Sequence, residues 1–151
     1  LINNDIDFYY MKDNYSSQKG MKQVNINKPM NLATIGELFL WYIASNTSPI
    51  HADSKAKKIK DAELQKIFKQ MKYEKALTYL TSKCCLETQE KYPGNHINWW
   101  NFKKTKKMLQ KAGFKTITQS AYGQSFCPIL RNTYYFDNTH PKWSFYIEAY
   151  K

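Results

Sequence analysis

The sequence predicts an α/β protein in which a mostly helical part precedes one further helix and two final strands. Residues 101–113 form a helical pattern, because Asn101 is a good N-cap, an apolar face follows at helical spacing, and Gly113 stands where a helix would stop. Residues 114–122 alternate with period two and contain β-branched residues, which indicates a strand directly after the helix. Residues 143–150 are predicted to form the second strand.

The order of the elements predicts how these strands pair. Residues 1–7 resemble the end of an earlier strand that runs into a polar loop. Helices between that strand and residues 114–122 act as a crossover, which makes the two flanking strands parallel. Between residues 122 and 143 there is no helical pattern for a second crossover. The last strand is therefore expected to pair antiparallel with its predecessor, or beside it.

The middle of the chain is predicted to be helical cover for this sheet. Asn31 is a candidate N-cap for a helix over residues 32–45, which is too apolar for a surface element. Asp61 opens the longest helical pattern, whose apolar stripe continues after a phase shift at Tyr73. One long helix with a kink fits this pattern, which fades at residues 92–94.

No linker or internal repeat divides the sequence. We expect a single domain over residues 1–151, with a strand end and helical cover in residues 1–93 and a helix–strand–strand unit in residues 94–151. The chain begins with Leu1 and not with Met, which favours a piece of a longer protein.

The composition is basic, with 23 Lys and Arg against 12 Asp and Glu and a formal net charge of +11. Such a charge raises nucleic acid or a membrane surface as partners. Arg131 is the one arginine, however, and the guanidinium group makes the best bidentate contacts to phosphate and guanine. A solvated basic face is the ordinary explanation, and nucleic-acid binding is the alternative.

Two features favour a soluble protein in the cytoplasm. The longest wholly apolar run covers residues 39–44, far short of the ~20 residues that cross a bilayer, and no secretory signal is visible. The three cysteines, Cys84, Cys85 and Cys127, are odd in number and lack zinc-site spacing, as expected of reduced structural thiols.

The predicted topology places a candidate ligand site at one edge of the sheet. In a parallel α/β sheet, ligands bind outside the carboxyl ends of the strands. Three segments reach this edge. They are the loop after the first strand, the segment before the helix that starts at residue 101, and the segment after the strand that ends at residue 122. Their candidate substrate-side residues are Asn4, Asp5, His96, Trp99, Trp100, Tyr122, Gly123 and Ser125.

Chemical roles for these residues have structural alternatives. His96 could act as a general base near neutral pH, and the tryptophans could exclude water. The alternatives are a hydrogen-bonded structural histidine and, for Trp99 and Trp100, a hydrophobic staple that plugs the core. Glu148 is expected to serve the sheet edge or a salt bridge. The five glycines are too far apart for a phosphate or nucleotide loop, and the three histidines lie far apart with no Cys or carboxylate cluster, so no metal site is expected.

The carboxyl-terminal part of the sequence resembles a known family. The matching motifs are Asn95-His-Ile-Asn-Trp-Trp-Asn-Phe, Met108-Leu-Gln-Lys-Ala-Gly-Phe, Tyr122-Gly-Gln-Ser and Ser144-Phe-Tyr-Ile-Glu-Ala. They resemble the carboxyl-terminal part of class I S-adenosylmethionine-dependent methyltransferases of the methyltransferase type 11 kind, of which many are found with polysaccharide biosynthesis. Asp5 similarly matches an aspartate at the end of the family's fifth strand, whereas Asn4 replaces a usual proline.

This resemblance implies the carboxyl-terminal portion of a Rossmann-like methyltransferase sheet with a helical insert. S-adenosylmethionine is the implied cofactor, but the family's Gly-rich loop and acidic cofactor residue are not in this chain, so that the chain alone is expected to be inactive. The implied partner is a small-molecule methyl acceptor, such as a sugar or polysaccharide precursor, with His96 as a candidate base. A homo-oligomer or pairing at a strand edge is a further expectation. The alternatives are a non-catalytic α/β interaction module and a basic nucleic-acid-binding protein.

Overall fold

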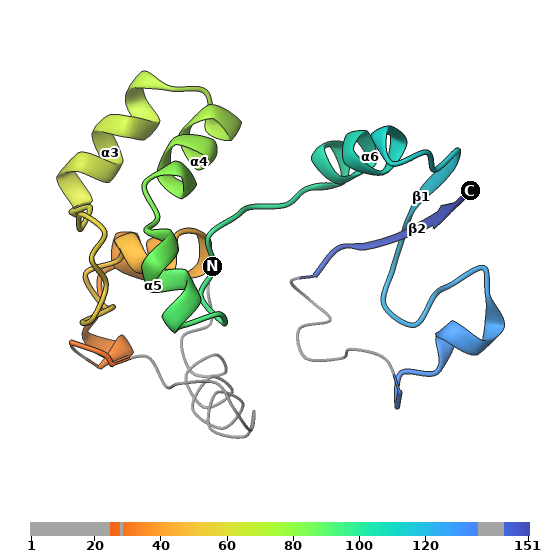
Figure 1. The fold of residues 1–151 in the computed structure, drawn as a ribbon, viewed down its shortest axis with the longest axis horizontal. Helices are drawn as coiled ribbons and strands as arrows, with labels where there is room; N and C mark the ends of the chain where they lie inside the picture. Colours follow the sequence, from red (N-terminus) through yellow and green to blue (C-terminus); the bar gives the residue numbers. More distant parts are fainter. Residues whose placement is uncertain (1–24, 28, 136–143) are drawn as a thin grey trace. The chain divides into compact units, whose positions relative to one another are not determined.

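The computed structural model describes residues 25–27, 29–135 and 144–151. These residues form five α-helices and a two-stranded antiparallel sheet, so the described chain is mostly helical with a small sheet (Figure 1). The chain divides into two compact units, Leu1–Trp99 and Trp100–Lys151, which we call the first and second units.

The first helices in the described part of the first unit are the short 3-10 helix η1 (Met30–Leu32) and α2 (Ile35–Ile43). The prediction that Asn31 caps a helix over residues 32–45 was wrong. Thr34 is the N-cap, because its hydroxyl accepts the Glu37 N–H at 3.1 Å while the Glu37 carboxylate accepts the Thr34 N–H at 2.9 Å. This reciprocal capping box satisfies two backbone donors that a helix start leaves unpaired.

The segment predicted as one long helix forms three helices, of which the first two are α3 (Asp61–Gln70) and α4 (Tyr73–Ser82). The prediction was wrong because Met71 and Lys72 are extended, with ψ angles of 147° and 145°. The two extended residues rotate the apolar stripe, which explains its phase shift in the sequence. A short helix, α5 (Leu86–Lys91), follows, and 3-10 helix η2 (Ser45–Thr47) lies between α2 and α3.

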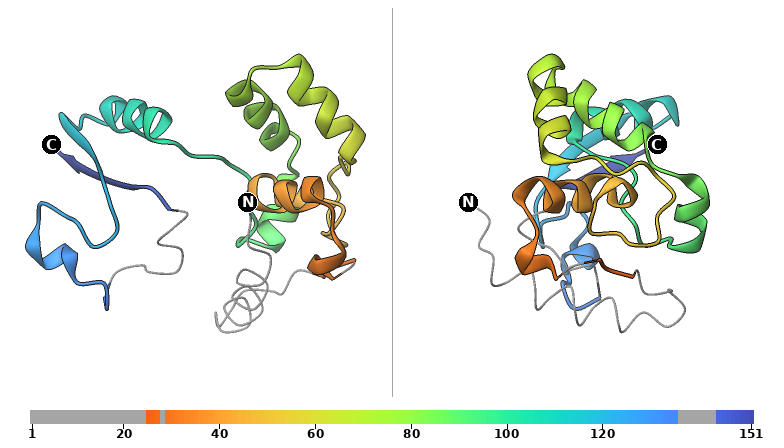
Figure 2. Two further views of the ribbon diagram at one scale, coloured as in Figure 1. Left: turned by 180° about the vertical axis from the view of Figure 1, so that it is seen from behind. Right: turned by 90° about the vertical axis from the view of Figure 1, so that its left-hand side faces the viewer.

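The hydrophobic core of the first unit lies among α2, α3 and α4, which contact one another pairwise (Figure 2). Gly36 allows the close approach of α2 and α3, because a Cβ atom there would lie 2.3 Å from Asp61 Oδ1. The Thr34 hydroxyl also donates to Asp61 Oδ1 at 2.9 Å, which fixes the start of α2 on the start of α3. The buried core residues are Leu40, Ala44, Ile59, Leu64, Ile67, Ala76 and Leu80.

The second unit contains α6 (Phe102–Lys111), strand β1 (Thr116–Ser120), 3-10 helix η3 (Pro128–Arg131) and strand β2 (Tyr146–Tyr150). The predicted start of α6 is confirmed, because the Asn101 side chain accepts the Lys104 N–H at 2.8 Å. Its predicted end is confirmed by Gly113, which has a φ of +88°, a conformation that favours glycine.

The two strands pair antiparallel, as predicted for the last strand and its predecessor. In the register, Thr118 lies opposite Glu148 and Ser120 lies opposite Tyr146. The expected strand over residues 1–7 lies outside the described residues, so a parallel crossover to it stays a prediction.

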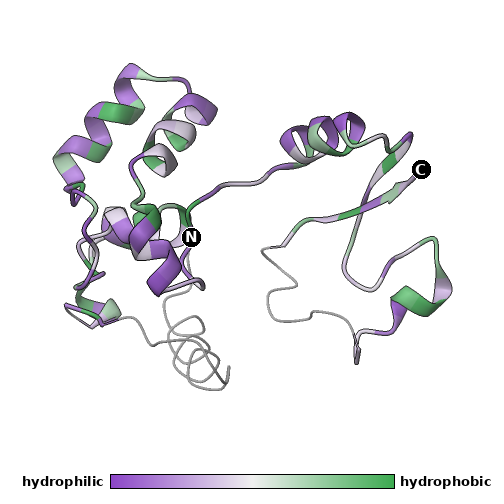
Figure 3. Ribbon diagram, in the orientation of Figure 1, coloured by the Kyte–Doolittle hydropathy of each residue, from purple (hydrophilic) through white to green (hydrophobic). Residues whose placement is uncertain are grey.

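Little of the described second unit is buried. Helix α6 contains no buried residue, and Ile117 on β1, 8% exposed, is the one buried apolar side chain in the described part of the unit. Phe126 and Ile129 are 70% and 78% exposed, and η3 stands out as an apolar segment of the ribbon in Figure 3. None of the helices in the described ranges combines the length and apolarity that a membrane span requires.

Candidate functional site

A tight turn follows β1 and forms the centre of the candidate site. The Gln124 N–H donates to the Ala121 carbonyl at 3.0 Å, and the Ser120 hydroxyl donates to the Gln124 carbonyl. Gly123 has a φ of +66°, which an L side chain rarely adopts. These contacts fix the Tyr122–Ser125 motif as a defined loop directly at the end of the strand.

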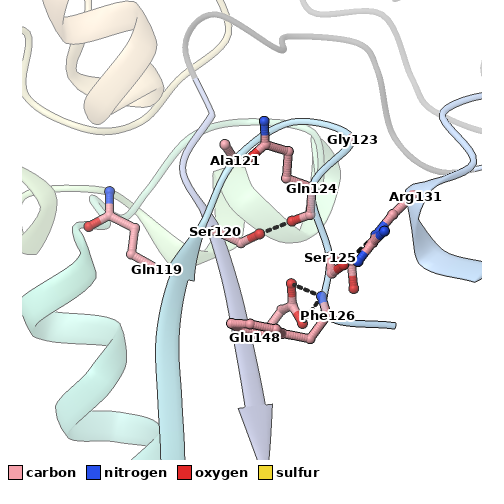
Figure 4. Close-up of a pocket in the computed structure, with 9 residues that line it drawn as sticks. All are labelled: Gln119, Ser120, Ala121, Gly123, Gln124, Ser125, Phe126, Arg131 and Glu148. Atoms are coloured by element: carbon pink, nitrogen blue, oxygen red, sulfur yellow. Dashed lines mark hydrogen bonds between the residues drawn. The ribbon is translucent and has the colours of Figure 1, made fainter. Parts of the chain in front are cut away.

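Two cavities lie against this turn and share most of its residues. The larger cavity has a volume of about 630 Å³ and the smaller one about 260 Å³. Figure 4 shows the larger cavity, with Arg131 approaching the turn from η3 and Glu148 from β2. Its lining residues are Gln119, Ser120, Ala121, Gly123, Gln124, Ser125, Phe126, Arg131 and Glu148. Tyr122 lines the smaller cavity, where its ring centroid lies 6.0 Å from that of Tyr146.

Glu148 connects β2 to the loop after the turn. Its two carboxylate oxygens accept the Phe126 N–H at 3.0 and 3.2 Å, and one of them accepts the Tyr150 hydroxyl at 2.9 Å. Partial desolvation raises the pKa of Glu148, but these hydrogen bonds and those from Ser120 and Ser125 lower the pKa by more, so the net shift is downward. Glu148 therefore stays ionised and braces the loop. The expected salt bridge is not among the ion pairs of the described residues.

Arg131 ends η3 and holds the other side of the loop. Its Nε–H donates to the Ser125 carbonyl at 2.6 Å, and the Ser125 hydroxyl accepts the Cys127 N–H at 3.0 Å. This hydrogen bond holds the exposed guanidinium group beside the cavity.

The structure brings together three of the residues that we predicted from the sequence, Tyr122, Gly123 and Ser125. Trp100 also belongs to the second unit; it is 50% exposed, with Lys104 Nζ 4.8 Å from the centre of its ring. Asn4 and Asp5 lie outside the described residues.

His96 and Trp99 belong to the first unit. The His96 backbone pairs with Ser45, whose N–H donates to the His96 carbonyl at 2.7 Å and whose hydroxyl accepts the His96 N–H at 2.8 Å. The His96 side chain is exposed, with its ring centroid 6.4 Å from that of Tyr42. Trp99 is buried, and its indole N–H donates to the Thr78 hydroxyl at 3.2 Å.

Sequence reasoning missed a buried polar cluster around His51. The His51 ring is 0% exposed, with Nε2 2.9 Å from the Asn95 amide nitrogen and Nδ1 buried without a partner. Burial, and then the charge of Lys58, lower the His51 pKa to about 4. Nearby, the Tyr92 hydroxyl donates to Asp53 at 2.6 Å. No local signal identifies this cluster, because Asn95 and His51 are 44 positions apart.

Lys58 lies beside this cluster as a half-buried amine. Its Nζ donates to the His51 carbonyl at 2.5 Å and to the Asn46 carbonyl at 3.1 Å. Burial lowers the Lys58 pKa to about 8. The contacts cross-link the buried segment after α2, which is a structural role.

The described part of the chain contains no group of three side chains that could hold a metal ion, and its three cysteines are free thiols. No family model, curated protein or solved structure matches this chain. The function must therefore be argued from the site itself.

Proposed function

We propose that the second unit is the acceptor-side part of a class I S-adenosylmethionine-dependent methyltransferase. One observation carries this proposal: the Tyr122–Ser125 motif forms a fixed turn at the end of β1 and lines cavities that Glu148 of β2 also lines. The motif therefore lies at the end of β1 and beside the antiparallel strand β2. In such an enzyme the methyl acceptor would have to bind at this end of the strand.

The order of elements adds support. Helix α6 ends at Gly113, β1 follows at once, and β2 returns antiparallel to it. The motifs that resemble the methyltransferase family fall on the end of this helix, on the turn after β1, and on β2 itself.

The described residues do not fit S-adenosylmethionine. The five glycines of the sequence lie far apart, so none of them forms the Gly-rich loop that receives the cofactor in the family. We therefore assign no cofactor contact to this chain. Its own residues would bind and orient the acceptor in the cavities beside the turn, and an enzyme gains much of its rate from such positioning.

His96, the general base that we predicted from the sequence, belongs to the first unit and has an exposed imidazole, and its role as a base stays a prediction. Trp99 is better explained as a core residue, since its ring is buried and its indole N–H is paired with Thr78.

A non-catalytic interaction module is the second candidate. In the described residues, β1 and β2 pair with each other and with no third strand, so each leaves an edge that another strand could join.

Calorimetry with S-adenosylmethionine separates the two candidates. The 151-residue chain should give no binding heat, whereas a product that also contains the coding sequence upstream of Leu1 should bind the cofactor. Ser125→Ala and the matched surface control Glu90→Gln should both leave that affinity unchanged, since neither residue is assigned to the cofactor. A longer product that is folded but does not bind S-adenosylmethionine would refute the methyltransferase and leave the interaction module.

A further inference from the structure

Helix α6 differs in charge from the other α-helices that the structure describes. It contains five lysines and no acidic residue, whereas α2, α3, α4 and α5 each carry an Asp or Glu in the first turn. The surrounding sequence is equally one-sided, because residues 100–135 contain six lysines, Arg131 and no Asp or Glu. The helix therefore presents a surface that attracts anions. Its lysines are Lys103, Lys104, Lys106, Lys107 and Lys111.

The same helix has a separate apolar face. With about 3.6 residues per turn, the lysines occupy one side of the helix, and Phe102, Met108 and Leu109 occupy the other. Helix α6 packs against β1, and Phe102 and Leu109 are partly covered, but Met108 is 49% exposed. The apolar face therefore extends beyond the contact with the sheet.

Trp100 continues this apolar surface ahead of the helix. It is 50% exposed, and Lys104 Nζ lies 4.8 Å from the centre of its ring. Lys104 and Met108 are four positions apart, so they are neighbours on the surface of α6. Trp100 and Met108 thus lie on either side of the Lys104 stem, along one edge of the helix. This edge combines exposed apolar side chains with positive charge.

A bilayer that contains anionic lipids complements both properties of this edge. Lysines near such a surface are attracted to lipid phosphates, and tryptophan prefers the interface between headgroups and acyl chains. Basic helices with an aromatic and aliphatic face lie in that interface. Nucleic acid would attract the same lysines, but it offers no acyl phase in which Met108 could be buried.

We propose that α6, together with Trp100, binds the surface of a membrane that contains anionic lipids. The helix lies along this surface, with Trp100 and Met108 in the interface and the lysines on lipid phosphates. None of the residues of α6, nor Trp100, lines the two cavities beside the turn. The inference therefore goes beyond the proposed function and does not rest on it.

Vesicle sedimentation tests the proposal on the 151-residue chain. Vesicles of phosphatidylcholine and phosphatidylserine in a two-to-one mixture should bind the chain at low salt. Vesicles of phosphatidylcholine alone should bind it at least tenfold more weakly, because they carry no net charge for the lysines. Binding to the mixed vesicles should also weaken as the salt concentration rises, since salt screens charges at an exposed surface.

Tryptophan fluorescence reports whether Trp100 enters the interface. Trp41 and Trp99 are buried, whereas Trp100 is half exposed. Addition of the mixed vesicles should shift the emission of the chain to shorter wavelength. The shift should be smaller in Trp100→Phe, and the difference between the two spectra isolates the contribution of Trp100.

Variants separate the lysines from the apolar residues. The double variant Lys103→Gln and Lys107→Gln should weaken binding to the mixed vesicles at least tenfold. The matched pair Lys66→Gln and Lys69→Gln removes the same charge from exposed positions of α3 and should leave binding unchanged. Met108→Gln keeps the charge and the length of the side chain, and should weaken binding at least fivefold. Circular dichroism of each variant establishes that the chain is still folded.

Three results would overturn the proposal. The first is failure of the chain to bind the mixed vesicles at low salt, and the second is an equal loss of binding in the α3 and α6 double variants. The third is tighter binding to the single-stranded RNA poly(U) than to the vesicles, with no effect of Met108→Gln on either. That result would assign the lysines of α6 to nucleic acid.

Discussion

Single buried or half-buried polar groups decide much of the local structure. Glu148 was expected at a sheet edge or in a salt bridge, yet its carboxylate accepts the Phe126 N–H and holds the loop beside the turn. His51 is fully buried with one unpartnered ring nitrogen. Both roles depend on groups far away in the sequence, and both make the protein sensitive to substitution at one position.

The pH dependence of stability should depend on His51. Its pKa is about 4 when folded and 6.5 in the unfolded chain, so the unfolded state takes up a proton first as the pH falls. Stability is then complete above pH 6.5 and is lost as the pH falls towards 4, by about 3 kcal/mol for a shift of this size. Thermal unfolding between pH 7 and 4, followed by circular dichroism, should show this decline.

The control separates His51 from other titrating groups. Asp53, hydrogen-bonded by Tyr92, also has a lowered pKa, but its contribution is lost below its ordinary value of 3.8, outside this window. His51→Phe should flatten the profile between pH 5 and 6.5, a range that lies above the ordinary pKa of Glu148, 4.5, below which that carboxylate contributes to the decline. An identical decline in His51→Phe would contradict the assignment.

At the scale of single elements, the starts of α6 and α2 show which local signals are sufficient to predict where a helix begins. Asn101 caps α6 as its sequence context indicated, because the N-cap, the apolar face and Gly113 all agree on one register. Ahead of α2 the sequence analysis chose Asn31, whereas the reciprocal hydrogen bonds with Glu37 make Thr34 the cap.

Substitution of the two candidates should have different effects. Thr34→Ala removes the cap of α2 and the bond to Asp61, and should lower the free energy of unfolding by about 1–2 kcal/mol. Asn31→Ala should change it by less than about 0.5 kcal/mol, as usual for surface substitutions. Urea unfolding followed by circular dichroism measures both values. Equal losses would show that Thr34 is not the cap that matters.

At the scale of the whole molecule, the two units differ in how much they bury. The first unit has a cluster of buried apolar residues among three helices, whereas Ile117 is the one such residue in the described part of the second. The second unit therefore gains little from the hydrophobic effect and depends on hydrogen bonds of the sheet and turn.

Hydrogen exchange should reveal this difference. We expect the amides of Ile67 in α3 and Leu80 in α4 to be protected at least tenfold more than those of Ile117 and Ile147 in the sheet, because the sheet opens without disrupting a large core. Mass spectrometry of peptic fragments, or resonances of these amides, gives the comparison. Equal protection would mean that the chain opens as one cooperative unit.

Local patterns were enough for α6, β1 and β2 of the second unit, but they did not predict the short 3-10 helix η3. The cap at Asn101, the glycine at 113 and the two strand patterns act over a few neighbouring residues, and the absence of a second crossover required an antiparallel pair. The break at Met71 is visible in the sequence only as a phase shift of the apolar stripe. A two-residue interruption changes the direction of the chain, but the helical spacing of apolar residues continues after it.

The sequence by itself determined where α6, β1 and β2 form, that the strands are antiparallel, and that the Tyr122–Ser125 motif follows β1. Only the tertiary structure decided that Glu148 and Arg131 flank this turn, and that Asn95 meets His51 in a buried cluster. The reason is physical: capping and periodicity act between near neighbours, whereas a cavity or a buried polar contact depends on which distant segments the packed chain brings together.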